Sequence, residues 1–310
     1  MQYRSFGRLG WLVGEIGYGM WGLAGWSGSD DDETSAALER AVELGCNFFD
    51  TAWAYGNGHS ERLLGALVRN HTGKELYVAT KVPPKNFKWP SRRGYTLADC
   101  FPADHIREYA EKSLANLDLP RIDLLQFHVW EDSWARDEEW QRAIEDLKRQ
   151  GKIRAAGVSV NRWEPANVVE TLRTGLVDAV QVIFNIFDQS PQDELFPVCR
   201  ELNVAVIARV PFDEGTLTGN LTKTSRWPQG DWRNSYFVPE NLAQSVDRAE
   251  ALRPLVPAGM TMPELALRWI LADEAVSTII PGMRKVKHVA ANLAASDGRP
   301  LEPDLLDRLK

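Results

Sequence analysis

The segment Asn47-Phe-Phe-Asp-Thr-Ala-Trp-Ala-Tyr-Gly-Asn-Gly-His-Ser-Glu-Arg-Leu-Leu-Gly65 is the part of the chain around which the rest is organised. A short apolar run ends at Asp50, and Tyr55 follows in a turn closed by two glycines. A Ser-Glu pair then opens an amphipathic segment. We expect the acid and the phenol to lie together at the carboxyl end of a strand, where α/β folds bind ligands. A buried Asp that caps a helix, beside a tyrosine packed in a loop, is the alternative that this segment leaves open.

Strand-like and helix-like segments alternate along the whole sequence. Two short strands in 3–13 suggest a hairpin, and a first inner strand is expected over 15–18. Roughly eight strand-helix units without a composition break predict one α/β domain over 1–310, a (β/α)8 TIM barrel with a short N-terminal β-hairpin cap. Further strands are expected at 75–82, 122–129, 153–160, 177–184, 204–210 and 276–280, and helices at 35–44, 104–117, 138–149, 165–172, 191–202, 240–255, 262–271 and 286–295.

Two segments near the C-terminal half depart from the alternation. The stretch Asp213–Pro239 has little periodicity and much Gly, Pro and Trp. A loop of this length in a compact domain is usually functional or mobile, so we expect it to cover a ligand. The last residues, Leu305–Lys310, are typical of the beginning of a helix.

Composition excludes several classes of function. Of the 310 residues 44% are hydrophobic and 25% charged, as in ordinary globular proteins, and the net charge of -7 disfavours a broad nucleic-acid surface. Cys46, Cys100 and Cys199 are far apart and lack zinc-site spacing, so we expect reduced thiols, no metal site and a cytoplasmic protein. No apolar run is long enough for a signal peptide or a membrane span. The oligomeric state is left open.

Four polar residues stand at or just after expected strand ends: Asp50, Tyr55, Lys81 and His128. A strand-end lysine and a core histidine are common by themselves. If Lys81 lies against Tyr55, however, its charge stabilises the phenolate and lowers a pKa that begins near 10. Asp50 would hold the lysine, and His128 would hydrogen-bond a substrate oxygen. A tyrosine tuned in this way gives or accepts a proton near neutral pH.

None of these side chains can donate hydride, so a cofactor is implied. The chain has no Gly-rich dinucleotide fingerprint after its first strands and no Walker loop. Barrels frequently bind phosphate near their last two strands, and here 280–285 leaves the last strand for a helix. Arg284 and Lys285 would bind phosphate there, although a solvated basic turn is the alternative.

In these residues the chain resembles the aldo-keto reductases. Asp50-Thr-Ala with Tyr55-Gly, the lysine of Ala79-Thr-Lys81, and the histidine of Asp123-Leu-Leu-Gln-Phe-His128 look like that family's catalytic tetrad in order and context. The resemblance covers essentially the whole chain and implies a barrel oxidoreductase that uses NADP(H), with NAD(H) as the other option. It extends to Gly157-Val-Ser159, Gln181, Pro211, Gly215, Leu217-Thr-Gly219, Ala266-Leu-Arg-Trp269 and Ile280-Pro-Gly282.

The resemblance also implies roles. Tyr55 is the general acid for reduction of a carbonyl, Lys81 with Asp50 tunes it, and His128 orients the carbonyl oxygen. Ser159 and Gln181 would hold the nicotinamide carboxamide, and the pyrophosphate would lie under the loop after Pro211. The full set of cofactor residues is Gly19, Met20, Ser159, Gln181, Arg209, Pro211, Phe212, Leu217, Gly219, Gly282, Arg284, His288 and Asn292.

Three positions depart from the family pattern. Val160 stands where many members have Asn, and Asn161 comes one place later. Arg209 stands where an aromatic residue commonly stacks on nicotinamide; a planar guanidinium can also stack, but it adds a charge. His288 stands where other members carry Arg or Gln, so that the preference for NADP over NAD depends mainly on Arg284.

Loop tryptophans suggest an aromatic or apolar substrate pocket, with expected walls at Trp21, Trp26, Trp53, Trp89 and Trp130. The leading interpretation is a reductase of small aldehydes, ketones or sugar-like carbonyls. A second is a regulatory protein that binds the cofactor with little turnover, as potassium-channel beta subunits, which resemble this fold, do. A third is an isomerase or lyase that uses Lys81 as a nucleophile on a phosphorylated sugar.

Overall fold

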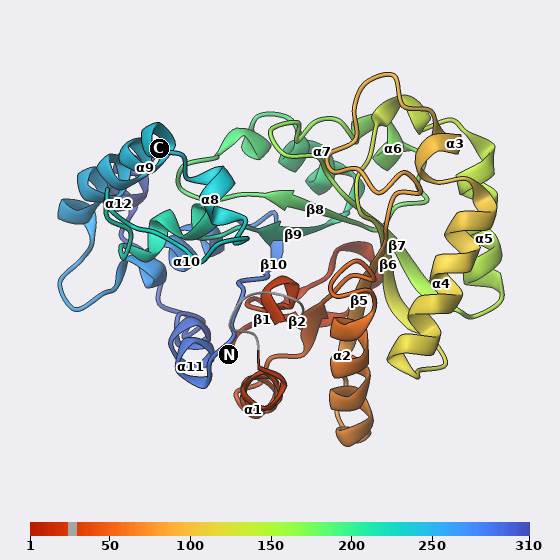
Figure 1. Ribbon diagram of the computed structural model, residues 1–310, viewed down its shortest axis with the longest axis horizontal. Helices are drawn as coiled ribbons and strands as arrows, with labels where there is room; N and C mark the ends of the chain where they lie inside the picture. The colour runs from red at the N-terminus through yellow and green to blue at the C-terminus, as the bar shows by residue number, and fades with distance from the viewer. Residues whose placement is uncertain (24–29) are drawn as a thin grey trace.

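The computed structural model describes residues 1–23 and 30–310. In these ranges eight parallel strands form one sheet in sequential order. Parallel bridges from Ile16 to Ile279 and from Gly19 to Gly282 bring its two ends together. The predicted (β/α)8 barrel is therefore confirmed as a nearly closed barrel (Figure 1). Its strands are β3 (Tyr18–Gly19), β4 (Phe48–Asp50), β5 (Tyr77–Val82), β6 (Ile122–Phe127), β7 (Ile153–Ser159), β8 (Ala179–Ile183), β9 (Ala205–Arg209) and β10 (Val276–Ile279).

Helices lie between the strands and cover the outside of the barrel (Figure 1). Helix α5 shows why they form: Asp137 caps its first turn, accepting from the Glu139 amide at 2.9 Å, and two basic residues end it. Its buried face carries Trp140, Ile144 and Leu147. The helices are α1 (Asp31–Glu43), α2 (His59–Asn70), α3 (Leu97–Cys100), α4 (Ala103–Leu117), α5 (Glu138–Arg149), α6 (Val169–Arg173), α7 (Leu195–Leu202), α8 (Arg233–Tyr236), α9 (Pro239–Leu252), α10 (Met262–Leu271), α11 (Val286–Ala294) and α12 (Pro303–Arg308).

The expected N-terminal hairpin is present. Strands β1 (Tyr3–Ser5) and β2 (Leu12–Gly14) pair antiparallel. Phe6 and Trp11, from the connection between them, pack against rings at the amino ends of the barrel strands: the Phe6 and Phe48 centroids lie 5.2 Å apart, and the Trp11 and Tyr77 centroids 5.0 Å apart. The hairpin therefore covers the amino-terminal end of the barrel.

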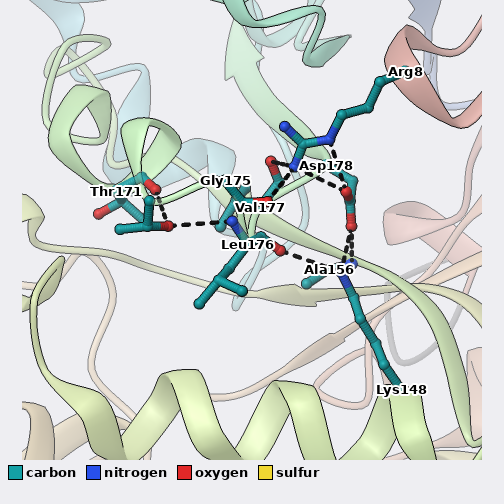
Figure 2. Close-up of polar contacts among 9 residues, drawn as sticks. Arg8, Lys148, Ala156, Thr171, Gly175, Leu176, Val177 and Asp178 are labelled. Atoms are coloured by element: carbon teal, nitrogen blue, oxygen red, sulfur yellow. Dashed lines mark hydrogen bonds and ion pairs between the residues drawn. The ribbon is translucent and has the colours of Figure 1, made fainter.

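Asp178, just before β8, ties this end together. Its carboxylate is nearly buried and accepts from the Ala156 amide at 3.0 Å, from Arg8 Nη2 at 3.0 Å and from Lys148 Nζ at 2.8 Å. Figure 2 shows these donors, which come from the hairpin, from β7 and from α5, converging on one side chain. Because a buried charge is tolerated only when it is paired and hydrogen-bonded, we read this end as a stability element. The carboxyl ends of the strands are left for chemistry.

The segment after β9 has more structure than the sequence indicated. Residues 213–218 form η5, two short 3-10 pieces with a kink at Glu214 and Gly215, and residues 233–236 form α8. Trp227 stacks on Phe237 at 5.2 Å between centroids, in a small cluster with Leu242 and Val246. A four-residue helix is too short to show periodicity, which is why the pattern missed it. Within the described ranges, no helix has the length and apolar character needed to cross a bilayer.

Candidate functional site

Polar side chains gather at the carboxyl ends of neighbouring strands. Asp50, Ser159 and Arg209 are the last residues of β4, β7 and β9. In the parallel register Lys81 pairs with Gln126, and Ser159 pairs with Gln181. Parallel strands bring these ends to one rim, so residues far apart in sequence meet there.

Lys81 joins the predicted acid and phenol. Its side chain is fully buried, and Nζ donates to Asp50 Oδ1, to the Thr51 carbonyl at 2.8 Å and to the Tyr55 hydroxyl at 3.4 Å. The other Asp50 oxygen, Oδ2, accepts from Gln126 at 2.8 Å and from Gln181 at 2.9 Å. A buried ammonium thus lies between a fully satisfied carboxylate and a phenol.

The pKa of Lys81 agrees with a charged lysine, but the pKa of Tyr55 differs from the expectation. Burial lowers the pKa of Lys81, but the charge of Asp50 and then that of Tyr55 more than offset it, so the net pKa is raised and the lysine stays charged. Burial raises the pKa of Tyr55 above its ordinary value of 10.0, and the Lys81 charge only partly opposes this. The expected lowering of the tyrosine pKa is therefore corrected: desolvation outweighs the lysine charge, and Tyr55 is a protonated phenol at neutral pH.

His128 follows β6 and faces the same phenol. Its backbone N–H donates to the Val82 carbonyl at 3.1 Å, and its ring centroid lies 5.7 Å from that of Tyr55. Burial, with the charges of Lys81 and Arg209, holds the pKa of His128 well below 6.5, and Nδ1 has no partner among the described residues. The imidazole is therefore neutral and carries one proton, which it can donate to an oxygen beside Tyr55.

The depressed pKa of His128 predicts a pH effect on stability. The unfolded chain takes up a proton at this residue below about pH 6.5, whereas the folded chain does not. Stability contributed by His128 is therefore lost as pH falls from 8 to 5, by at most about 1.4 kcal/mol per pH unit. We expect His128→Gln to show a shallower loss in urea unfolding over this range. Burial also lowers the pKa of His105, but this residue is present in both proteins, so its effect cancels in the comparison. Equal slopes of unfolding free energy against pH in the two proteins would contradict the prediction.

Of three expected tryptophans, one lies beside His128, one packs against a helix residue, and one is buried away from the site. Trp89 lies 5.5 Å from the His128 ring between centroids and is 43% exposed, while Trp53 packs edge-on against Tyr109. Trp130 is 0% exposed and donates to Thr171 Oγ1 at 2.7 Å, deep between barrel and helices. It is not an accessible pocket wall, because its ring packs into the outer core.

Three further aromatic residues bear on the expected substrate pocket. Trp21 contacts Trp232, from the loop after β9, at 5.2 Å between centroids. Trp26 lies outside the described residues. Phe87, which the sequence reasoning did not single out, is half-exposed and lies 6.2 Å from both Trp53 and Trp89. Its place two residues before Trp89 in one Pro-rich loop was the available signal.

The expected nicotinamide residues lie on three neighbouring strands: Ser159 and Arg209 end β7 and β9, and Gln181 is in the middle of β8. Arg209 Nη2 donates to the Val160 carbonyl at 2.9 Å, and its Nε is buried with no partner among the described residues. Asn161 is committed elsewhere: its amide nitrogen donates to the Trp130 carbonyl at 2.8 Å and to Ser91 Oγ at 2.9 Å. The side chain of Asn161 is therefore held by the loops that carry Ser91 and Trp130.

The expected phosphate residues lie where the first and last strands meet. The Gly19 amide donates to the Pro281 carbonyl at 3.0 Å, and a Cβ on Gly19 would lie 2.6 Å from the Ile280 carbonyl oxygen, so only glycine fits. Gly282 is exposed, and a Cβ built on it would meet no atom of the described residues within 4 Å, so its backbone borders open space. Burial, and then the charges of Lys287, Lys285 and Arg284, lower the pKa of His288, which marks a basic cluster beside this opening.

Other expected cofactor residues differ in exposure. Met20 and Leu217 have no exposed surface. Asn292 lies on α11 and Pro211 two residues after the end of β9, and both are buried. Phe212 and Gly219 are partly exposed at the two ends of η5.

This arrangement can be compared with known proteins. The family model described as "Aldo/keto reductase family" matches residues 15–310. The chain belongs to the aldo/keto reductase family. It is therefore an oxidoreductase of a family that acts on small carbonyl compounds with nicotinamide cofactors.

Individual relatives share less than a third of their residues with this chain. The NADH-specific methylglyoxal reductase of Escherichia coli is 29% identical, over 91% of this chain and 90% of that protein. A probable voltage-gated potassium channel subunit beta of rice is 27% identical, over 100% and 96%. Among solved structures, an aldo-keto reductase of Bacillus halodurans in its holo form superposes with a TM-score of 0.78 at 26% identity, over 100% and 96%.

Proposed function

We propose that this protein is an NADP(H)-dependent reductase of small aldehydes or ketones, with Tyr55 as the general acid. The observation that supports it most is the buried chain of contacts from Asp50 through Lys81 to the Tyr55 hydroxyl, beside a neutral His128. The free thiols of Cys46, Cys100 and Cys199 are buried, in keeping with the cytoplasm as the proposed compartment.

The chain's own residues account for the proton side of the reaction. The bound nicotinamide would supply the hydride. His128 donates a hydrogen bond to the carbonyl oxygen and holds it next to the Tyr55 hydroxyl. Tyr55, protonated at neutral pH, gives its proton to that oxygen as negative charge develops there. Lys81 stabilises the phenolate that remains, and Asp50 keeps the ammonium in place.

The residues present fit a dinucleotide cofactor whose nicotinamide end is neutral in its reduced form and whose phosphate-bearing end is anionic. At one end, the carbonyl oxygen of Gln181 and the buried Nε of Arg209 would meet the nicotinamide. At the other, the open space at Gly282 adjoins the basic cluster of Arg284, Lys285 and Lys287, which suits phosphate. The extra phosphate of NADP(H) is favoured by these charges; NAD(H), used by one relative, is the alternative.

Removal of the Arg284 charge should separate the two nucleotides. We expect Arg284→Leu to weaken NADPH binding roughly ten-fold or more, because a hydrogen bond to a charged group contributes about 1.5–3 kcal/mol. NADH binding should change little. Quenching of tryptophan fluorescence by each nucleotide measures both constants, with exposed Arg121→Leu, beside the amino end of β6, as the matched control. An equal loss for both nucleotides would contradict the role of Arg284 in phosphate binding.

The experiment that tests the proposed function is oxidation of NADPH and NADH by the purified protein with a panel of aromatic, aliphatic and sugar aldehydes. Turnover above the no-enzyme rate supports a reductase. Tight nucleotide binding without turnover on any carbonyl would favour the regulatory alternative, to which the channel-subunit relative points. The lyase alternative needs a neutral Lys81, and the raised pKa of this paired lysine argues against it.

A further inference from the structure

Three polar side chains form a layer inside the barrel. Asp50, Gln126 and Gln181 come from β4, β6 and β8 and are 2%, 1% and 2% exposed. Inward side chains of such barrels are layered, and each layer comes from alternate strands. These three strands alternate in the sheet order, so their side chains meet across the interior rather than along one strand pair.

The hydrogen bonds of this layer run in a defined direction. Gln126 Nε2 and Gln181 Nε2 donate to Asp50 Oδ2 at 2.8 and 2.9 Å, and Gln181 Nε2 also donates to Gln126 Oε1 at 3.2 Å. An ionised carboxylate only accepts, so both amide nitrogens must face it. Gln181 therefore keeps its NH2 group inward, which leaves its carbonyl oxygen as the atom available to a ligand.

Space for Gln126 is provided by the neighbouring strand. Gly157 on β7 pairs with Gln126 in the parallel register. A Cβ at position 157 would lie 2.9 Å from Gln126 Cγ, closer than such contacts allow. A large polar side chain in the barrel interior is thus accommodated by a residue that has no side chain.

We propose that Gln126 is a positioning residue that joins the two halves of the reaction, holding Asp50 on the proton-transfer side and orienting Gln181 toward the nicotinamide carboxamide. The inference rests on the proposed reductase function. Gln126 itself touches neither substrate nor cofactor. It acts through Asp50 Oδ2, while Lys81 occupies Oδ1.

The test uses Gln126→Met, which keeps the length of the side chain and removes both its hydrogen bonds. Gln181 loses an acceptor and its amide can turn, so NADPH should bind roughly ten-fold more weakly and kcat should fall about ten- to a hundred-fold, as when supporting partners of reactive groups are removed. The less neutralised Asp50 charge raises the pKa of Tyr55. In alcohol oxidation, where Tyr55 must be deprotonated, the rise of kcat with pH should therefore shift to higher pH.

A second variant gives an independent signature. Gln126→Glu places a carboxyl group in hydrogen-bond contact with Asp50, and two carboxylates this close hold one proton between them. As pH falls, this pair takes up its proton, which restores a hydrogen bond between position 126 and Asp50. Carbonyl reduction by Gln126→Glu should therefore recover at lower pH, whereas reduction by Gln126→Met should not. A role limited to packing would give no such difference.

Thr80→Val is the matched control. Thr80 is buried on β5 and donates outward to Glu61 Oε1 at 2.7 Å, so its loss removes a hydrogen bond of similar burial away from the site. We expect lower thermal stability with unchanged pH profile and NADPH affinity. Wild-type affinity, kcat and pH profile in Gln126→Met, or identical behaviour of Gln126→Met and Thr80→Val, would overturn the inference while the reductase function stands. Failure of the wild-type protein itself to reduce any carbonyl would instead overturn both.

Discussion

Tyr55→Phe should lower the rate of carbonyl reduction by about 100- to 10,000-fold, which is the rate enhancement that a positioned general acid supplies. The hydroxyl that this change removes is the one 3.4 Å from Lys81 Nζ. A phenylalanine ring keeps the packing against His128, so folding and NADPH binding should be close to wild type. We expect the variant to oxidise almost no NADPH in the presence of an aldehyde while its dissociation constant for NADPH stays unchanged.

The matched control is Tyr95→Phe. Tyr95 is partly buried in the loop that carries Trp89, and Lys88 Nζ lies 5.9 Å from its ring centroid. Among the described residues its side chain has no hydrogen bond or ring contact with Asp50, Tyr55, Lys81 or His128. Turnover of Tyr95→Phe should stay within about two-fold of wild type, since a peripheral hydroxyl contributes little. If Tyr55→Phe turned over as fast as Tyr95→Phe, another group would have to supply the proton.

Lys81→Met should have two large effects. Turnover should fall by a factor of about 100 or more, because the phenolate loses the charge that stabilises it. Stability should fall by about 3–5 kcal/mol, the cost typical of leaving one partner of a buried ion pair without the other. Residual reduction should extend to higher pH, because Tyr55 without this charge has a still higher pKa and stays protonated longer.

The double variant Lys81→Met with Asp50→Asn separates these effects. Neutralising the orphaned carboxylate should recover most of the stability in urea unfolding, while turnover stays low. A single Lys81→Met variant with wild-type stability and an unshifted pH profile would show that the ion pair has no part in tuning Tyr55.

Much of the fold could be predicted from the sequence because its signals are local. The helix expected at 138–149 coincides with α5, where a cap, an amphipathic face and a basic last turn agree. The strand expected at 204–210 stops at Arg209, because Val210 has a φ of 55°, which no regular strand continues. Short elements such as α3 and α8 have no periodic signature and were missed.

The site was predictable residue by residue but not contact by contact. Asp50, Lys81 and His128 stand at strand ends, so barrel geometry alone brings them to one rim. The spacing of residues along the sequence does not indicate on which side of a strand a ring lies. For this reason Trp130 was expected at the pocket, but it lies in the core between barrel and helices. Gln126 was missed because one polar residue in an apolar strand looks like an irregularity, although its place two residues before His128 puts both on one face of the strand.

Transfer of deuterium from cofactor to substrate is the most direct test of the proposed reaction. The protein would be incubated with an aldehyde that it turns over and with NADPH labelled with deuterium on one face of nicotinamide C4, each face in a separate sample. We predict that one of the two samples yields an alcohol with a single deuterium on the former carbonyl carbon, seen by mass spectrometry, and that Tyr55→Phe yields at most a trace of alcohol. An unlabelled alcohol from both samples, or labelled product from Tyr55→Phe at the wild-type rate, would contradict the account.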